Sequence, residues 1–347
     1  MSKSIFVLLS CAFCVLVSIA QAQSTYRCPL PTFPTSCNAI YWGGTADFPN
    51  LPAGTVCCNP TGAPFDEQCV TPRRGCIVPN TANDICLSCL TAGQPINLST
   101  GNTFIVQSDI SIPGLGGGLS LTRSWNSILP AIQATFPAMF GTNWRSTYEE
   151  RLIFNSSDLL LKYARSDGSV WSFGVIGTGP SVFETVTPGN DTTTITQSSQ
   201  AFTMLFKSGE KRTFAPTSGL LLSIIDRNGN TTQLAYDSQS RLATITDAAS
   251  RHLTFNYVSN SSNLVRSVTS DAGITYSYSY DNQGRLTQVT KPDNTTISFQ
   301  YDTNSHITAV LDTNGKVLES HTYDALGRGL TSSRANGVDG VTVTYPQ

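Results

Sequence analysis

Residues 274–290 read Ile274-Thr-Tyr-Ser-Tyr-Ser-Tyr280-Asp-Asn-Gln-Gly284-Arg-Leu-Thr-Gln-Val-Thr290, and this stretch contains the pattern that decides the fold. Its first seven residues alternate between apolar or aromatic side chains and small polar ones, which is the period of a β-strand. The four residues from Asp281 to Gly284 favour a turn, and a second short strand pattern follows them. The stretch therefore predicts a β-hairpin.

The hairpin pattern recurs along the last third of the chain. Strand-ending tyrosines are separated by 21, 23, 21 and 22 residues: Tyr236, Tyr257, Tyr280, Tyr301 and Tyr323. Further positions of the same motif recur in the turns: Asp237, Arg241, Asp281, Gly284, Arg285, Asp302, Asp324, Gly327 and Arg328. Two short strands cannot bury their apolar face alone and must stack on their neighbours. Residues 216–347 are therefore predicted to form one continuous antiparallel sheet of hairpin repeats.

The second strand of each repeat departs from simple alternation. Its apolar residues stand three positions apart, as in Leu242 and Ile245 or Leu286 and Val289. Strict alternation would place the two members of each pair on opposite faces. Either a β-bulge lies between them or both faces of the sheet are partly covered.

Composition agrees with an all-β chain and excludes one class of partner. Of 347 residues only 13% are charged, the net charge is −2, and Gly, Thr, Ser and Asn are abundant. No basic cluster is present that could neutralise a phosphate backbone, so nucleic acid is not an expected partner.

The N-terminus has the pattern of a secretory leader over residues 1–22. Lys3 precedes an apolar run from Ile5 to Ala20, and Ala20-Gln-Ala22 forms a small-residue cleavage site. No second apolar stretch approaches the roughly 20 residues that cross a bilayer. The mature chain is therefore expected to be secreted or displayed at the cell surface, without a membrane span.

Residues 24–90 are predicted to form a small disulfide-rich module. Eight cysteines fall within it and none follows: Cys28, Cys37, Cys57, Cys58, Cys69, Cys76, Cys86 and Cys89. An even number of cysteines in a short exported segment indicates disulfides, although the sequence does not select their pairing. A zinc site built on Cys86-Leu-Ser-Cys89 is the competing interpretation, but no second CxxC or nearby histidine completes it.

Residues 91–215 are predicted to form a separate β domain. Short strand patterns are spaced by Gly, Asn, Asp and Ser, and Asp167-Gly168 marks a hairpin turn between two of them. Pro130 and Pro137 favour a loop over a helix in residues 128–140.

The motif Tyr280-Asp-x-x-Gly-Arg-Leu286, with its degenerate copies, resembles the YD repeat of bacterial RHS proteins and the related teneurins. The segments 93–101, 109–114, 119–125 and 140–144 resemble the domain that commonly precedes YD repeats in RHS proteins. The resemblance implies a sheet that winds into a hollow shell, which in family members encloses a C-terminal toxin. It also implies carbohydrate binding as a second use of such repeats.

The chain departs from the RHS pattern at its end. Residues 341–347 lie inside what looks like another repeat, and the Pro and Asp-Pro closing motif of family shells is not found. The repeats are therefore expected to be incomplete, and a companion RHS chain or a toxin domain is an expected partner.

No catalytic, cofactor-binding or metal-binding residue is predicted. The repeated aspartates could be calcium ligands or paired acids for glycosidic cleavage, but an aspartate after a strand end caps its own turn. Asp226-Arg-Asn-Gly-Asn230 and Asp312-Thr-Asn-Gly315 lack the spacing of a calcium loop. His252, His306 and His321 are too scattered for a metal triad.

Two functions from different classes remain at this stage. The first is a non-catalytic, exported scaffold that forms part of an RHS-type shell in a toxin or contact-dependent competition system. The second is an adhesion module that binds surface glycans, for which Tyr276, Tyr278 and Tyr280 would provide a stacking platform. Cross-strand aromatic packing is the alternative use of these tyrosines.

Overall fold

The computed structural model describes residues 95–98, 100–155, 160–176, 182–187 and 191–345, together with the backbone of the strand segments 40–42, 56–58, 68–70 and 91–92. These residues contain no α-helix, and their helical turns are three short 3₁₀ segments: η1 (Leu115–Gly117), η2 (Ala131–Thr135) and η3 (Ala335–Gly337). Within this described part, no helix is long and apolar enough to cross a membrane. The all-β prediction is confirmed.

One antiparallel sheet of nineteen strands dominates the fold. Its first eight strands are β9 (Arg151–Asn155), β10 (Leu160–Ala164), β11 (Val170–Ile176), β12 (Val182–Thr187), β13 (Thr194–Gln197), β14 (Phe202–Leu205), β15 (Lys211–Phe214) and β16 (Leu221–Ile225). The sheet continues through β17 (Thr231–Tyr236), β18 (Leu242–Thr246), β19 (His252–Tyr257), β20 (Val265–Ser270), β21 (Thr275–Tyr280) and β22 (Leu286–Thr290). It ends with β23 (Thr296–Tyr301), β24 (Ile307–Leu311), β25 (Val317–Tyr323), β26 (Gly329–Arg334) and β27 (Val341–Thr342).

Three smaller sheets precede the large one. A three-stranded sheet contains β6 (Phe104–Ile112), β7 (Leu119–Asn126) and β8 (Trp144–Ser146), and a two-stranded sheet contains β4 (Thr91–Ala92) and β5 (Ile96–Asn97). The third contains β1 (Ile40–Trp42), β2 (Val56–Cys58) and β3 (Gln68–Val70), and its register places Cys57 opposite Cys69. Cys58 also lies on β2. The other five cysteines of the predicted module lie outside the described residues, as does the leader: Cys28, Cys37, Cys76, Cys86 and Cys89.

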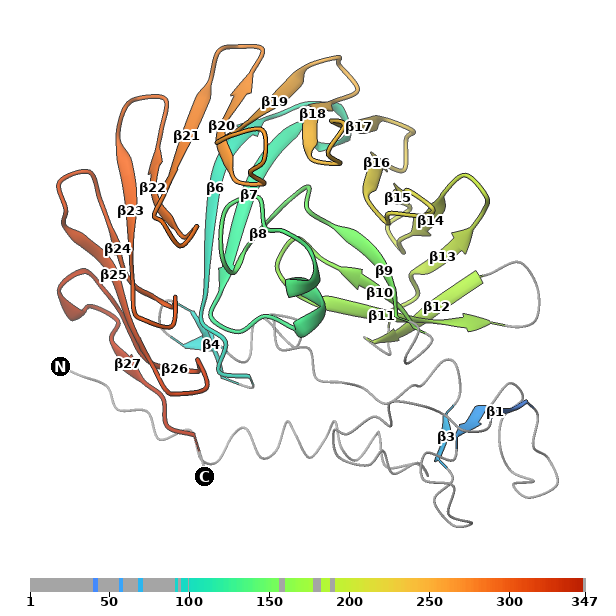
Figure 1. Ribbon diagram of the computed structural model, residues 1–347, viewed down its shortest axis with the longest axis horizontal. Coiled ribbons are helices and arrows are strands. Elements are labelled where there is room, and N and C mark those ends of the chain that lie inside the picture. The colour runs from blue at the N-terminus through green and yellow to red at the C-terminus, as the bar shows by residue number, and fades with distance from the viewer. Residues whose placement is uncertain are drawn as a thin grey trace.

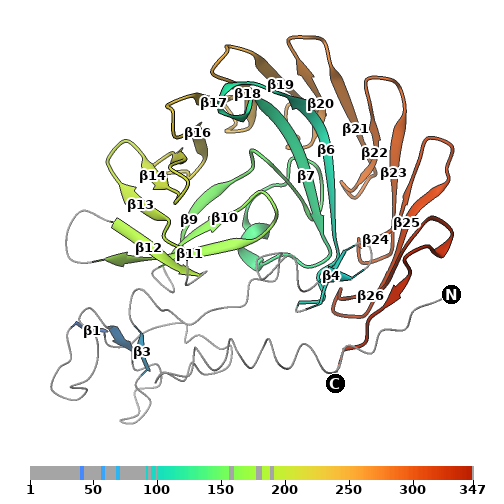
Figure 2. The same cartoon turned by 180° about the vertical axis from the view of Figure 1, so that it is seen from behind.

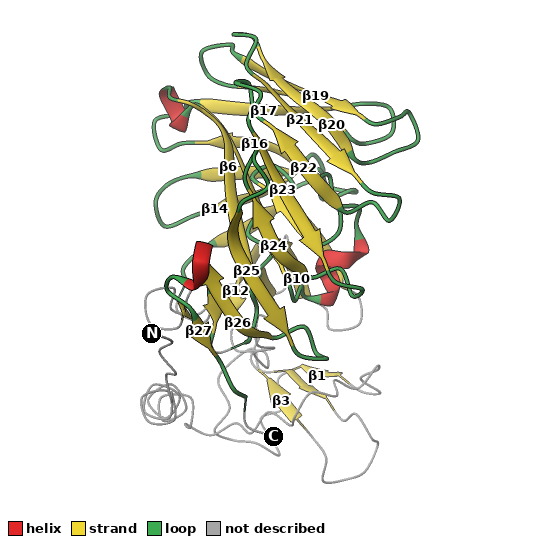
Figure 3. Cartoon of the chain, turned by 90° about the vertical axis from the view of Figure 1, so that its left-hand side faces the viewer, coloured by secondary structure: helices red, strands yellow, loops and turns green. Residues whose placement is uncertain are grey.

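The large sheet winds around the hairpin β6–β7, so that the hairpin and β8 fill its concave side (Figure 1). Figure 2 shows the same arrangement from behind, and Figure 3 shows the repeat strands crossing the molecule side by side. We refer to residues 104–146 as the plug and to β9–β27 as the shell. A single hydrophobic core joins them, because plug and shell residues belong to one buried cluster.

The first eight strands of the shell close into a ring. An isolated antiparallel bridge pairs Arg151 of β9 with Leu220, the residue before β16, and Leu152 N–H donates to the Gly219 carbonyl at 2.9 Å. Gly219 has φ +66°, and a Cβ at this position would lie 1.8 Å from the Leu152 carbonyl oxygen. Only glycine fits this seam between β9 and β16, and the remaining strands, β17–β27, continue from it as an open curve.

A β-bulge explains the three-residue spacing of apolar residues in the second strand of each repeat. In the β17–β18 pair the register shifts beside Tyr236, which pairs with Leu242, while Ala235 pairs with Thr244. The same shift occurs beside Tyr257, Tyr280, Tyr301 and Tyr323. One extra residue therefore brings Leu242 and Ile245 to the same buried face, where they are 2% and 0% exposed.

The structure also bears on the hairpin, loop and boundary predicted for residues 91–215. The hairpin at Asp167-Gly168 is confirmed, since β10 and β11 pair on either side of it. Residues 128–140 form a loop with only the short η2 turn, as the prolines indicated. The boundary predicted after residue 215 falls in the turn between β15 and β16, within one continuous sheet.

Candidate functional site

The repeat turns are held by an aspartate that caps its own turn. Asp281 Oδ1 accepts hydrogen bonds from the backbone N–H groups of Gln283 and Arg285, each at 2.9 Å, and Oδ2 accepts one from Arg285 Nε at 2.7 Å. Burial alone would raise the pKa of Asp281, but the hydrogen bonds from Arg285 and Gln283 outweigh it and lower the pKa. Gly284, at φ +73°, supplies the left-handed position that this turn requires.

The same arrangement recurs at the predicted aspartates Asp237, Asp302 and Asp324, whose partners are Arg241, His306 and Arg328. The turns at Asp226 and Asp312 are also capped in this way. The carboxylates therefore already accept hydrogen bonds from their own turns. Among the described residues, no group of three His, Cys, Asp or Glu side chains could hold a metal ion.

Each repeat tyrosine connects its repeat to the preceding one. Its hydroxyl donates to the backbone carbonyl of the residue that begins the bulged strand, at 2.7–2.8 Å: Tyr236 to Leu221, Tyr257 to Leu242, Tyr280 to Val265, Tyr301 to Leu286 and Tyr323 to Ile307. Tyr345 makes the same bond to Gly329. The regular spacing of the tyrosines thus reflects a hydrogen bond repeated from hairpin to hairpin.

The residue after each turn stacks on the tyrosine of the next repeat. Arg241 lies 4.2 Å from the centre of the Tyr257 ring, and Arg285 lies 5.0 Å from that of Tyr301. Arg328 stacks on Tyr345 in the same way at 4.2 Å. Asp, Arg and Tyr therefore form a ladder along the shell: the aspartate orients the arginine, and the arginine covers the next tyrosine.

A buried ion pair between β6 and β7 of the plug contacts the shell through Tyr278. Arg123 and Asp109, whose side chains are 1% and 4% exposed, contact each other through Nε–Oδ2 at 2.5 Å and Nη2–Oδ1 at 2.8 Å. Tyr278 of the shell donates its hydroxyl to Asp109 Oδ2 at 2.7 Å. Burial alone would lower the pKa of Arg123, but Asp109 outweighs it and raises the pKa. The Arg123 guanidinium therefore keeps its charge within the core.

A second buried charge cluster lies inside the ring. Glu150 Oε2 accepts a hydrogen bond from the Tyr163 hydroxyl at 2.5 Å and also contacts Arg212 Nη1. Burial and the neighbouring Glu150 carboxylate both raise the pKa of Tyr163 far above its ordinary value. The cluster joins β10 and β15 to the residue that precedes β9.

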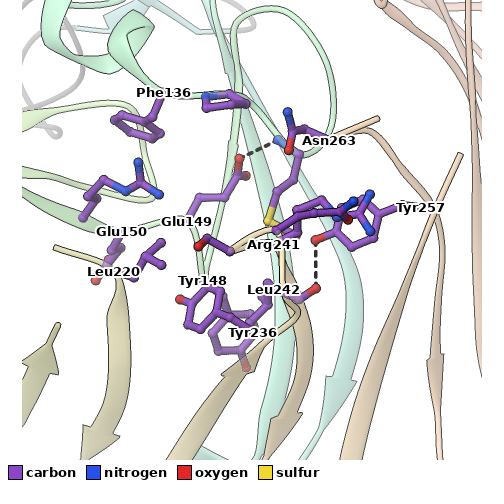
Figure 4. Close-up of a pocket in the computed structure, with 15 residues that line it drawn as sticks. Phe136, Tyr148, Glu149, Glu150, Leu220, Tyr236, Arg241, Leu242, Tyr257 and Asn263 are labelled. Atoms are coloured by element: carbon purple, nitrogen blue, oxygen red, sulfur yellow. Dashed lines mark hydrogen bonds between the residues drawn. The ribbon is translucent and has the colours of Figure 1, made fainter. Parts of the chain in front are cut away.

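A cavity of about 170 Å³ opens beside the ring seam (Figure 4). Tyr148 and Leu242 lie deep in its lining, Tyr236 and Tyr257 provide aromatic walls, and Glu149 reaches toward it from the segment before β9. Burial raises the pKa of Glu149, although hydrogen bonds and Arg145 act in the opposite direction. Of the described cavities, this one combines aromatic walls with both signs of charge.

The predicted tyrosine platform is not a free surface. Tyr278 is 3% exposed and bonded to Asp109, and the Tyr280 hydroxyl is bonded to the Val265 carbonyl at 2.7 Å. The three histidines have separate surroundings: His306 contacts Asp302, His252 contacts Thr246, and His321 is 2% exposed, with Nε2 3.6 Å from Glu319.

Sequence reasoning missed one turn of the ladder and both buried charge clusters. The turn Asp247–Arg251 follows no tyrosine, yet Asp247 caps it and Arg251 donates to the Pro113 carbonyl of the plug at 2.9 Å. Searching for aspartate followed four residues later by a cation would have found it. No local signal pairs Asp109 with Arg123.

Two family models match consecutive parts of the chain. A domain of unknown function, DUF6531, matches residues 93–173, and the Teneurin YD-shell model matches residues 182–306. The first match covers the plug and the start of the ring, and the second covers the rest of the ring and most of the repeats. The chain is therefore similar to YD-shell sequence over residues 182–306, as its tyrosine motif predicted, and to the RHS-associated domain over residues 93–173, as the segments before the repeats predicted.

Curated relatives with sequence similarity are much longer than this chain. They include the tRNA3(Ser)-specific nuclease WapA of Bacillus spizizenii and the tRNA nuclease WapA of Bacillus subtilis, each 30% identical over 154 residues. The match covers 44% of this chain and 6% of each relative. The nuclease activities in these names belong to the whole relatives.

Solved structures of toxin complexes have a partial likeness to the fold. The TcdB2-TccC3-Cdc42 complex matches at 10% identity and a TM-score of 0.29, over 72% of this chain and 16% of that one. The TcdB2-TccC3 complex matches at 17% identity and a TM-score of 0.27, over 69% and 12%. Scores this low do not define a shared function.

Proposed function

We propose that this chain is a non-catalytic, exported scaffold: a segment of an RHS-type shell that stacks with further shell sequence to carry or enclose a toxin domain. The observation that carries the proposal is the contact set of the last described repeat. Arg328 bonds to Asp324 and stacks on Tyr345, and Tyr345 bonds to Gly329, as their counterparts do inside the sheet. The ladder can therefore be extended by the same contacts.

Two further features support a scaffold. The concave side of the winding sheet is filled by the plug, whose buried Asp109–Arg123 pair accepts a hydrogen bond from Tyr278 of the shell, and plug and shell share one hydrophobic core. The capping aspartates and the repeat tyrosines make structural hydrogen bonds within and between the repeats, which supports a scaffold role for them. The secretory pattern of residues 1–22 supports export.

The proposal is tested by recovering the protein from the cell that makes it. An epitope tag inserted after Asn314 interrupts only the exposed turn capped by Asp312, where a Cβ added at Gly315 would meet no atom within 4 Å, and spares the tyrosine and arginine contacts of the ladder. Peptide mapping of the tagged material is expected to identify additional YD-repeat sequence and a domain outside the shell, attached to or associated with this chain. An untagged culture provides the control.

Two outcomes would overturn the proposal. Recovery of the chain alone from the medium, with saturable binding to a glycan array, would favour the adhesion function instead. Nuclease or glycosidase activity of the purified chain would contradict the non-catalytic assignment.

A further inference from the structure

The turn at Asp302 carries a histidine where other turns of the ladder carry an arginine. Three arginines follow their capping aspartate by four residues and stack on the tyrosine of the next repeat: Arg241, Arg285 and Arg328. In the turn between β23 and β24 the same position is occupied by His306. Its Nδ1 lies 3.1 Å from Asp302 Oδ2, and its ring centre lies 4.8 Å from that of Tyr323. His306 therefore takes the place of an arginine in both contacts.

The histidine ring lies between two repeats. Its side chain is 11% exposed, and a Cβ added at Gly327 of the next turn would lie 2.9 Å from His306 Nε2. The stacked Tyr323 donates its hydroxyl to the Ile307 carbonyl at 2.7 Å and meets Trp125 of the plug edge-on, with ring centres 6.3 Å apart. The tyrosine that His306 covers thus joins β25 both to β24 and to the plug.

Asp302 and Tyr323 are the groups that would interact with a positive charge on the histidine. Asp302 presents a carboxylate, and Tyr323 presents the face of its ring at an interplanar angle of 33°. The plug presents the neutral Ser127 carbonyl near the same point. The charged side chains of the adjoining turns are paired with one another: Arg285 with Asp281, and Arg328 with Asp324.

We propose that the contact of the Asp302 turn with β25 is a pH-sensitive joint in the shell, closed in acid and loosened as the pH rises. Histidine changes its charge between about pH 5 and 8, whereas arginine stays charged. Protonated His306 forms an ion pair with Asp302 and a cation–π contact with Tyr323. Neutral His306 keeps the stacking but loses both charge interactions. Their stabilisation of β25 is therefore present at low pH and is lost as the histidine gives up its proton.

The size of the change follows from two modest interactions. A partly exposed ion pair and a surface cation–π contact each correspond to about two- to fivefold in an equilibrium constant. Together they predict that local opening of β25 and β26 becomes about four- to twenty-five-fold more frequent between pH 5 and pH 8. The arginine contacts at Tyr301 and Tyr345 keep their charge over this range and should not respond.

Hydrogen exchange of the full chain between pH 5 and pH 8 measures this opening, after correction for the intrinsic pH dependence of exchange. Peptides covering β25 and β26 are expected to lose protection by about four- to twenty-five-fold as the pH rises. Peptides covering β21 and β22, two strands without histidine, provide the control within the same molecule and should keep their protection. His306→Arg should hold β25 and β26 at the acid level of protection at every pH, and His306→Gln should hold them at the lower level.

Two further variants separate His306 from the other histidines. His252→Gln replaces a histidine of β19 that contacts Thr246, and should leave the response of β25 and β26 unchanged. His321→Gln replaces a buried histidine of β25 that lies 3.6 Å from Glu319, and should also leave the response in place.

Three results would overturn the proposal. The first is constant protection of β25 and β26 in the parent protein. The second is an equal loss of protection in β21 and β22, because the pH would then act on the whole sheet. The third is a pH response that persists in His306→Arg, whether or not it disappears in His321→Gln.

Discussion

Replacing Asp109 with asparagine removes the counter-charge of a guanidinium that the core encloses almost completely. The Arg123 side chain is 1% exposed and lies 4.8 Å from the centre of the Trp144 ring. Water cannot replace the lost carboxylate without opening the contact between plug and shell. The substitution therefore leaves a charge buried and unpaired, which is among the most destabilising single changes.

The expected magnitude follows from this burial. Breaking a buried ion pair from one side costs about 3–5 kcal/mol, whereas an exposed pair contributes under about 1 kcal/mol. Asp339→Asn is the matched control, because Asp339 is 64% exposed and lies 3.8 Å from Arg334. A second substitution, Arg123→Met, made together with Asp109→Asn, should recover much of the loss because no charge then remains buried.

Urea unfolding followed by tryptophan fluorescence measures the effect, since Trp144 lies beside the substituted pair. With an unchanged denaturant slope, the midpoint gives the difference in unfolding free energy. A loss below about 1 kcal/mol for Asp109→Asn would refute the assigned role of the pair. A double variant less stable than Asp109→Asn alone would refute the reasoning about the unpaired charge.

The ring seam, the tyrosine ladder and its pH dependence give three further predictions. Gly219→Ala should lower stability in thermal unfolding several-fold more than Gly315→Ala. Both glycines have positive φ, but only at Gly219 would an added Cβ lie 1.8 Å from a backbone oxygen. Equal losses of stability would contradict the close contact at the seam. Tyr301→Phe should lower the unfolding free energy by about 1–2 kcal/mol in urea by deleting its 2.7 Å bond to a backbone carbonyl, and an unchanged midpoint would argue against the ladder. Burial raises the pKa of Tyr301 and of Tyr345 to about 12, above the unfolded value of about 10, so their contribution is present below pH ~10 and is lost as pH rises toward 12. Unfolding curves recorded between these pH values test the prediction, and an unfolding free energy that rises with pH would contradict it.

The repeat architecture could be predicted because its determinants are local. One short stretch contains an alternating strand, a turn residue such as Gly284 and the next strand. The hairpin can therefore be predicted from the local sequence alone. The three-residue spacing of Leu242 and Ile245 indicated either a bulge or a sheet covered on both faces, and the observed strand register shows that a bulge is present. The use of the tyrosine hydroxyl was not foreseen, because its acceptor belongs to the preceding repeat.

The plug contacts and the cavity could not be predicted because their partners are distant in the chain. Tyr278 and Asp109 form a hydrogen bond although they are 169 positions apart in the sequence. Which residues pair depends on which face of the plug hairpin turns toward the shell. The seam similarly depends on how tightly the first strands curl, which fixes the approach of Gly219 to Leu152. Neither curvature nor docking angle is encoded in a short motif.

The extensible shell is tested most directly by cryo-electron microscopy of the particle recovered from the producing cell. Strand β27 is expected to be followed by further hairpins, each with a tyrosine hydroxyl bonded to the preceding repeat, and the shell is expected to carry or enclose additional protein. A particle containing only this chain, with no protein strand paired along the outer edge of β27, would contradict it.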